Sequence, residues 1–153
     1  MTTERNIIIV GNPSTGKTNL MTKLTNNTFT DKLDPTIGVE FNKRLVNNTK
    51  LYIWTSNLHR CESLVKNYYR DANIILIVFD LTDRKSFDTL PNWIDEAKTY
   101  ASRIPIILVG TKADLKIGIT DKEIETLKFP YFKVSSKYSR GINLLLSQLT
   151  KQN

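Results

Sequence analysis

Four residues with a fixed spacing could bind an anion: Gly11, Gly16, Lys17 and Thr18, which satisfy the pattern G-x-x-x-x-G-K-[ST]. In such a loop the glycines let the backbone curl so that successive N–H groups face one anion. The lysine ammonium reaches the β- and γ-phosphates of a nucleotide, and the threonine hydroxyl binds Mg²⁺. An apolar strand over residues 7–10 precedes the loop, and a helical pattern follows it. We therefore interpret residues 11–18 as a phosphate-binding loop rather than as a chance match in a turn.

The composition limits the class of protein. The 153 residues suit one domain with a sizeable core, and no apolar run reaches membrane-spanning length. Because Cys61 is the only cysteine, an internal disulfide and a cysteine-rich metal site are excluded, and we expect a cytoplasmic location. The net charge of +7 is spread along the chain without a basic run, so we expect a solvated surface and no nucleic-acid partner.

Apolar runs alternate with helical patterns, which predicts one α/β domain with a mostly parallel sheet. The expected strands cover residues 7–10, 39–46, 51–54, 74–79, 104–109 and 131–134. Asn47-Asn48 is a turn signal that predicts an antiparallel hairpin between the second and third strands. One helix is expected to carry the apolar stripe from Phe87 to Ala101, and a capping box is expected at residues 120–123.

Polar segments follow four of the expected parallel strands, at residues 11–18, 80–83, 110–114 and 135–137. In an open parallel sheet, ligands bind beyond the carboxyl ends of the strands. The convergence of these segments predicts a nucleotide site at that edge.

Several motifs, taken in order, resemble those of one known family. Besides the phosphate-binding loop, they are Pro35-Thr36-Ile37-Gly38-Val39-Glu40-Phe41, Tyr68-Tyr69-Arg70-Asp71-Ala72, Phe79-Asp80-Leu81-Thr82-Asp83, Gly110-Thr111-Lys112-Ala113-Asp114 and Val134-Ser135-Ser136-Lys137. Over nearly its whole length the chain resembles a Ras-superfamily small GTPase, most closely of the Rab family. The resemblance implies a three-layer fold, with a six-stranded, mostly parallel sheet, one antiparallel hairpin strand and helices on both faces, in a single domain over residues 1–153. It also implies a monomeric molecular switch that binds GTP or GDP with Mg²⁺ and serves vesicle trafficking.

The resemblance assigns roles to residues of the base-binding loops. The Asp114 carboxylate would accept hydrogen bonds from N1 and N2 of guanine, which adenine cannot donate. Lys112 and Lys137 would cover the faces of the purine, and the Ser136 N–H would donate to guanine O6. The complete expected nucleotide-binding set is Asn12, Ser14, Thr15, Gly16, Lys17, Thr18, Asn19, Phe29, Thr111, Lys112, Asp114, Leu115, Ser135, Ser136 and Lys137. For Phe29, a place in the hydrophobic core is the alternative to a contact with the base.

The metal and catalytic residues are also implied by the resemblance. Thr18 and Thr36 would bind Mg²⁺, the latter when the γ-phosphate is present. Lys17 and Thr36 would support hydrolysis, with His59 as the weakest candidate, because a lone histidine in a polar loop is usually just exposed.

The resemblance breaks after Trp54. In place of Asp-Thr-Ala-Gly-Gln-Glu the chain has Thr55-Ser56-Asn57-Leu58-His59-Arg60, and one residue is missing before Tyr68. The aspartate that steadies the Mg²⁺ shell is thus Thr55, the glycine that senses the γ-phosphate is Leu58, and His59 stands nearest to the water-orienting glutamine. We expect slow hydrolysis of GTP.

Two other functions remain open. One is a non-hydrolysing, guanine-nucleotide-binding module that occupies Rab effectors or regulators. The other is a P-loop kinase or ATPase, against which Asp114 and residues 135–137 argue. Whether the protein is this binding module or the switch, effector and regulator proteins would bind through residues 37–41 and the following hairpin.

The chain as given ends at Asn153 without a cysteine for prenylation, so we expect no direct membrane anchor. Any association with a membrane would then need a partner or a lipidated tail.

Overall fold

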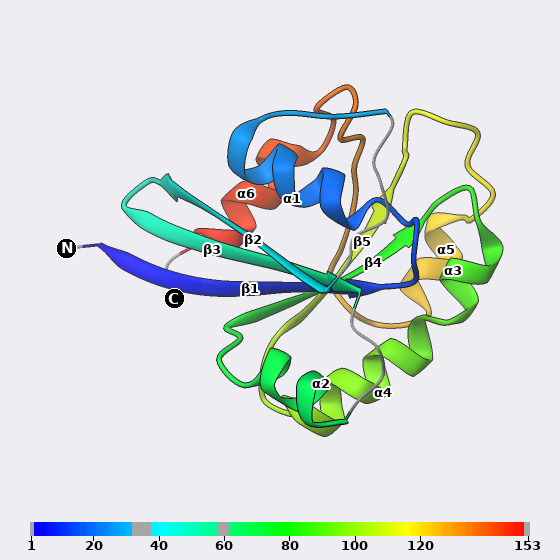
Figure 1. Cartoon of the computed structure of the whole chain (residues 1–153). Coiled ribbons are helices and arrows are strands. Elements are labelled where there is room, and N and C mark those ends of the chain that lie inside the picture. The colour runs from blue at the N-terminus through cyan, green and yellow to red at the C-terminus, as the bar shows by residue number, and fades with distance from the viewer. Residues whose placement is uncertain (1, 32–37, 58–61, 152–153) are drawn as a thin grey trace.

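Six strands form one sheet in this computed structural model, which describes residues 2–31, 38–57 and 62–151 of the chain (Figure 1). The strands are β1 (Thr3–Gly11), β2 (Gly38–Val46), β3 (Thr49–Asn57), β4 (Ile74–Asp80), β5 (Ile106–Thr111) and β6 (Tyr131–Lys133). Their order across the sheet is β2-β3-β1-β4-β5-β6, with β2 antiparallel to β3 and the other neighbours parallel. The predicted six-stranded, mostly parallel sheet with one antiparallel strand is confirmed.

Helices cover both faces of this sheet (Figure 1). One layer contains α1 (Lys17–Asn26) and α6 (Ile142–Leu149), and the other contains α2 (Glu62–Tyr69), α3 (Arg84–Asp88), α4 (Leu90–Tyr100) and α5 (Asp121–Glu125). No helix within the described ranges has both the length and the apolar character needed to cross a membrane.

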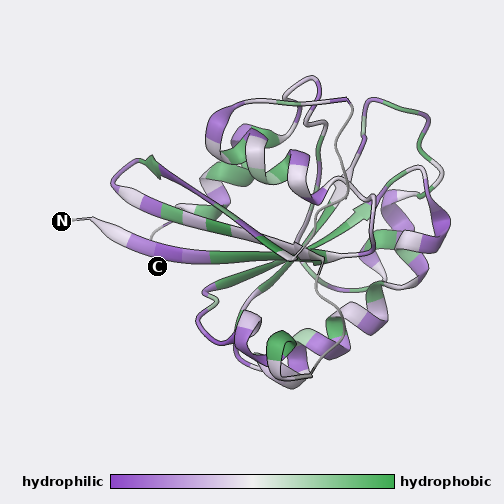
Figure 2. Ribbon diagram, viewed as in Figure 1, coloured by the Kyte–Doolittle hydropathy of each residue, from purple (hydrophilic) through white to green (hydrophobic). Residues whose placement is uncertain are grey.

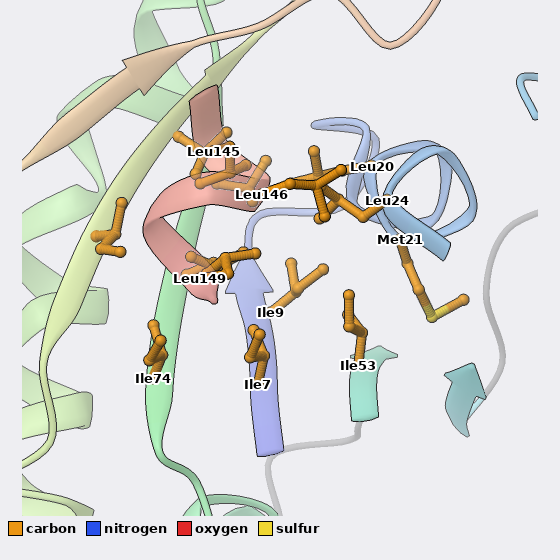
Figure 3. Close-up of a cluster of buried hydrophobic side chains, with 14 of the residues drawn as sticks. Ile7, Ile9, Leu20, Met21, Leu24, Ile53, Ile74, Leu145, Leu146 and Leu149 are labelled. Carbon is orange, nitrogen blue, oxygen red and sulfur yellow. The ribbon is translucent and has the colours of Figure 1, made fainter. Parts of the chain in front are cut away.

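The core consists of two apolar clusters separated by the sheet. In β1 the side chains alternate, so Ile7 and Ile9 join the cluster under α1 and α6 while Ile8 and Val10 join the cluster under α2 and α4. Figure 3 shows the first cluster, in which leucines of α1 and α6 meet above β1. In Figure 2 the central part of the sheet is largely hydrophobic, whereas the hairpin of β2 and β3 and the helices also carry hydrophilic segments. The central strands are buried on both faces, as is typical of a parallel sheet. Because these strands are parallel, their carboxyl ends lie at one edge of the sheet.

The hairpin between β2 and β3 turns at the predicted residues. Asn47 and Asn48 both have positive φ values, 49° and 63°. Two such residues match a type I′ turn, which suits the twist of paired strands and which asparagine tolerates well. Thr120 and Glu123 form the predicted capping box at the start of α5.

One predicted helix is wrong, because the stripe from Phe87 to Ala101 is divided between α3 and α4. Thr89 both ends α3 and begins α4. Pro91, in the first turn of α4, has no N–H to continue the hydrogen bonds of the preceding helix, so a new helix begins there. Some strand limits also differ: β1 is longer than predicted, β5 begins after Pro105, and β6 ends at Lys133.

Candidate functional site

The phosphate-binding loop leaves β1 at a position that only glycine can occupy. A Cβ on Gly11 would lie 2.2 Å from the Val78 carbonyl oxygen of β4, and its φ is 149°. Gly16, which precedes α1, also has a positive φ of 96°. The loop therefore passes close to β4 and then turns directly into the first turn of α1, where backbone N–H groups favour an anion.

Lys17 lies across this loop with its ammonium held by the backbone. Its Nζ donates to the Gly11 carbonyl at 2.8 Å and to the Asn12 carbonyl at 2.7 Å. Burial lowers the pKa of Lys17 from 10.5 to about 8. The two acceptors are neutral carbonyls, so a phosphate beside the ammonium would favour its charged form.

Asp114 lies in the loop after β5, next to the loop after β6. Its Oδ1 accepts a hydrogen bond of 2.8 Å from the Ser135 hydroxyl, and that hydroxyl oxygen accepts from the Tyr138 N–H at 3.2 Å. Ser135 is fully buried. Asp114 itself is half-buried, and an ionised carboxylate can accept more hydrogen bonds than the one from Ser135. Ser135 thus orients a carboxylate that still has acceptor capacity.

The loops after β5 and β6, which we call the base-side loops, are joined to the phosphate-binding loop by Lys112. Its Nζ lies 2.7 Å from Asp80 Oδ2 at the end of β4 and donates to the Ser14 carbonyl at 3.2 Å. Burial acts to raise the pKa of Asp80, but hydrogen bonds from Lys112 and Thr82 outweigh it and hold that pKa below its ordinary value. The Thr111 hydroxyl adds a second bridge, since it lies within hydrogen-bond distance of the Thr15 carbonyl.

The remaining predicted nucleotide-binding residues surround this centre. The side-chain amide of Asn19 makes two hydrogen bonds with Thr30: Nδ2 donates to its carbonyl at 3.0 Å and Oδ1 accepts from its N–H at 3.1 Å. Phe29, one residue earlier, is half-buried and belongs to neither apolar cluster, which speaks against the alternative of a core position, and its contact with the base stays a prediction. Lys137 Nζ lies 3.8 Å from Asp31 Oδ1, which brings the segment after α1 beside residues 135–137. Ser136 is buried and Leu115 is exposed.

Thr55 marks the carboxyl end of β3, and its hydroxyl is fully buried and makes no hydrogen bond. It shares a sheet face with Leu51 and Ile53, which pack in the cluster under α1. α1, which begins at Lys17, packs on that face through Leu20, Met21 and Leu24. A hydroxyl is a neutral oxygen ligand that suits Mg²⁺, so Thr18 fits the ion, whereas the fully buried Thr55 adds no charge beside it.

Two predicted residues, Thr36 and His59, lie outside the described residues. Within the described ranges, no three histidine, cysteine, aspartate or glutamate side chains gather as a metal site. Magnesium bound with a nucleotide takes much of its coordination from phosphates and water, so such a cluster is not required.

Two residues of the site were not predicted. Asp80 was recognised only as part of a polar segment at the edge of the sheet, although its position after a fully apolar strand is a signal. Trp93 of α4 donates from Nε1 to Asn12 Oδ1 at 2.8 Å, and the helical stripe gave no reason to single it out.

Comparisons with known proteins agree with this arrangement. A model of the Ras family matches residues 6–153. Ras-related protein RabC of Dictyostelium discoideum is 32% identical over an alignment 159 residues long, which covers 95% of this chain and 81% of that protein. Ras-related protein Rab-18-B of Danio rerio is 33% identical, with coverages of 95% and 77%. Ras-related protein Rab-4A of Bos taurus is 38% identical over 131 residues, which cover 82% of this chain and 59% of that protein. The resemblance drawn from the motifs is confirmed.

Proposed function

Because this chain belongs to the Ras family of small GTPases, we propose that it binds GTP and GDP with Mg²⁺ as a Rab-like switch and hydrolyses GTP slowly. The observation that carries the proposal is the half-buried Asp114 carboxylate, held by the Ser135 hydroxyl at 2.8 Å. A role in vesicle trafficking is part of the proposal and rests on the Rab relatives.

Base selection would come from Asp114. An ionised carboxylate only accepts hydrogen bonds, so it matches the two donors of guanine N1 and N2 and leaves adenine unmatched. Lys112 is held by Asp80 and Ser14, which would keep its stem over one face of the purine. Lys137, Ser136 and Phe29 would complete the pocket.

Phosphate binding would come from the phosphate-binding loop and Lys17. The loop N–H groups would surround the phosphates, and the ammonium would stay close to the γ-phosphate as negative charge develops there. Thr18, together with Thr36, would hold Mg²⁺. Bound Mg²⁺ would act as a Lewis acid that neutralises charge on the β- and γ-phosphates.

Slow hydrolysis follows from residues 55–60. Thr55 cannot supply the charge of the aspartate that it replaces, and Leu58 cannot bring its N–H as closely as glycine. His59 is the remaining candidate for orienting a water molecule. We therefore propose that binding is retained and that the chemical step is impaired.

Competition between nucleotides tests the binding proposal. Displacement of fluorescent GDP should require far less GTP than ATP, and Lys17→Ala and Thr18→Ala should both weaken GDP binding while the protein stays folded. Comparable potency of ATP would overturn the proposal, as would full GDP affinity in Lys17→Ala.

A second candidate function is a non-hydrolysing module that binds partner proteins. It is favoured by the β2 edge of the sheet, where Val39 and Phe41 are 45% and 43% exposed and could contact effectors or regulators. Single-turnover hydrolysis separates the two functions. Phosphate release above that of Lys17→Ala supports the switch, whereas release at that background supports the module.

A further inference from the structure

An indole from α4 is bonded to the phosphate-binding loop. Trp93 Nε1 donates to Asn12 Oδ1 at 2.8 Å, although the residues are 81 positions apart in the sequence. The Trp93 ring packs against the apolar cluster that α4 shares with β4 and β5, so the ring has a fixed position. Its N–H therefore provides a rigid support for Asn12.

Asn12 accepts two further hydrogen bonds within the loop. Its carbonyl accepts from Lys17 Nζ at 2.7 Å and from the Thr15 hydroxyl at 2.8 Å. The neighbouring Gly11 carbonyl supplies the second acceptor for Lys17 at 2.8 Å. If the backbone of Asn12 rotated, its carbonyl would move and would displace both the Lys17 ammonium and the Thr15 hydroxyl.

The chain after Asn12 does not hold this geometry by itself. Pro13 has no N–H to donate, and Ser14 has a φ of 62°, which costs free energy for a residue other than glycine. A conformation of this kind persists only when the surroundings impose it. Lys112 and Thr111 hold the carbonyls of Ser14 and Thr15. The hydrogen bond from Trp93 is the corresponding constraint on Asn12, and it comes from the helix layer that contains α4.

We propose that Trp93 is a positioning residue of the nucleotide site, which acts through the Asn12 side chain to hold the carbonyls that place the Lys17 ammonium. Trp93 does not itself touch the phosphates. The inference rests on the proposed nucleotide binding and adds a residue to it.

The test compares GDP release from matched variants. Trp93→Phe keeps an aromatic ring against the core but removes the N–H, and it should speed the release of fluorescent GDP by roughly five- to tenfold, the loss expected for one hydrogen bond. Trp54→Phe makes the same change at the other tryptophan of the chain, in β3, and should leave release within about twofold of the original rate. Release from Trp93→Phe that equals the original rate would overturn the proposal.

A double-variant cycle distinguishes positioning from a general loss of stability. Asn12→Leu removes the acceptor with little change of shape, so it should speed release by a factor similar to that of Trp93→Phe. The combined variant should then be no faster than about the quicker single variant, because both changes break one bond. Multiplication of the two effects, to roughly 25- to 100-fold, would contradict the inference.

Fluorescence supplies a readout that does not depend on the release rate. In a Trp54→Phe background Trp93 is the only tryptophan, since the chain has two. GDP or inorganic pyrophosphate should change the Trp93 emission, and Asn12→Leu should abolish that change. If GDP does not bind but pyrophosphate changes the emission through Asn12, the guanine proposal fails and the positioning role stands. An emission that responds equally with and without the Asn12 side chain would overturn the positioning role.

Discussion

The base-side loops and the carboxyl end of β3 lie on the same edge of one sheet but differ in how their polar groups are bonded. In the base-side loops, Ser135 holds Asp114, Asp80 holds Lys112, and Thr111 reaches the phosphate-binding loop. At the end of β3, the buried Thr55 hydroxyl has no hydrogen bond.

This difference indicates which of the two proposed activities, nucleotide binding or GTP hydrolysis, is preserved. Side chains fixed by their neighbours bind a ligand without a large loss of conformational freedom, so the base-side loops are organised for binding. A buried hydroxyl without a partner adds little to binding or to folding, and it carries no charge for a metal shell. Binding and hydrolysis are therefore expected to respond differently to substitution in the two regions.

The largest effect is expected from Asp114→Asn. The amide would keep an oxygen for the Ser135 hydroxyl but would present an N–H₂ where the carboxylate accepts from guanine. GDP affinity should fall about 100-fold, the loss of roughly two charge-assisted hydrogen bonds, and xanthine nucleotides should gain affinity. Equilibrium titration measures both. Asp121→Asn, in the exposed ion pair with Lys133, is the control, and unchanged GDP affinity in Asp114→Asn would remove the base-reading role.

Lys112→Ala should have the next largest effect, on folding stability. The Asp80 side chain is 8% exposed and would lose the cation that lies 2.7 Å away. A buried carboxylate without its partner should lower the free energy of unfolding by about 2 kcal/mol, measured by urea denaturation without nucleotide. Lys133→Ala breaks the exposed pair with Asp121 and should cost less than about 0.5 kcal/mol. Equal effects of the two substitutions would mean that the base-side loops are not held by Asp80.

A smaller effect is expected from pH. In the free protein the pKa of Lys17 is lowered to about 8 by burial, and a bound phosphate should raise it again. Below pH 8 the ammonium is already charged and affinity is full; above pH 8 binding must take up a proton, so affinity falls by at most about tenfold per pH unit. Titration with GDP between pH 7 and 8.5, below the range in which guanine N1–H ionises, should show this fall. Lys17→Arg stays charged, and a fall of the same size in that variant would assign the pH dependence to another group.

The smallest effect is expected from the two unbonded hydroxyls of β3. Thr49 and Thr55 are both fully buried without a hydrogen bond, at opposite ends of the strand. Thr49→Val and Thr55→Val should each leave the free energy of unfolding unchanged or raise it by up to about 1 kcal/mol, because no bond is lost. A marked loss of stability in Thr55→Val alone would show that its hydroxyl is bonded in solution, and the contrast between the two regions would disappear.

The sequence predicted the fold better than it predicted the site. The alternation of apolar strands, the Asn47-Asn48 turn and the capping box at Thr120 are local patterns, and all three are confirmed. The break at Thr89 was missed because the apolar stripe continues across a single residue that ends one helix and begins the next.

Contacts between distant segments were beyond what local patterns can predict. Lys112 and Asp80 meet because β4 and β5 are neighbours, and Trp93 meets Asn12 because α4 packs beside the end of β1. Each pair depends on side-chain directions that only the assembled layers determine.

The central claim is that guanine-nucleotide binding is intact while residues 55–60 limit hydrolysis. Single-turnover hydrolysis of GTP tests it most directly, measured on the original chain and on a variant in which residues 55–60 become Asp-Thr-Ala-Gly-Gln-Glu with the missing residue restored. We predict that GDP affinity changes little, while hydrolysis becomes at least about tenfold faster, a modest share of what a catalytic group contributes. Equal hydrolysis rates in the two proteins would contradict the account and would assign the catalytic role to a group already present, with His59 the first to substitute.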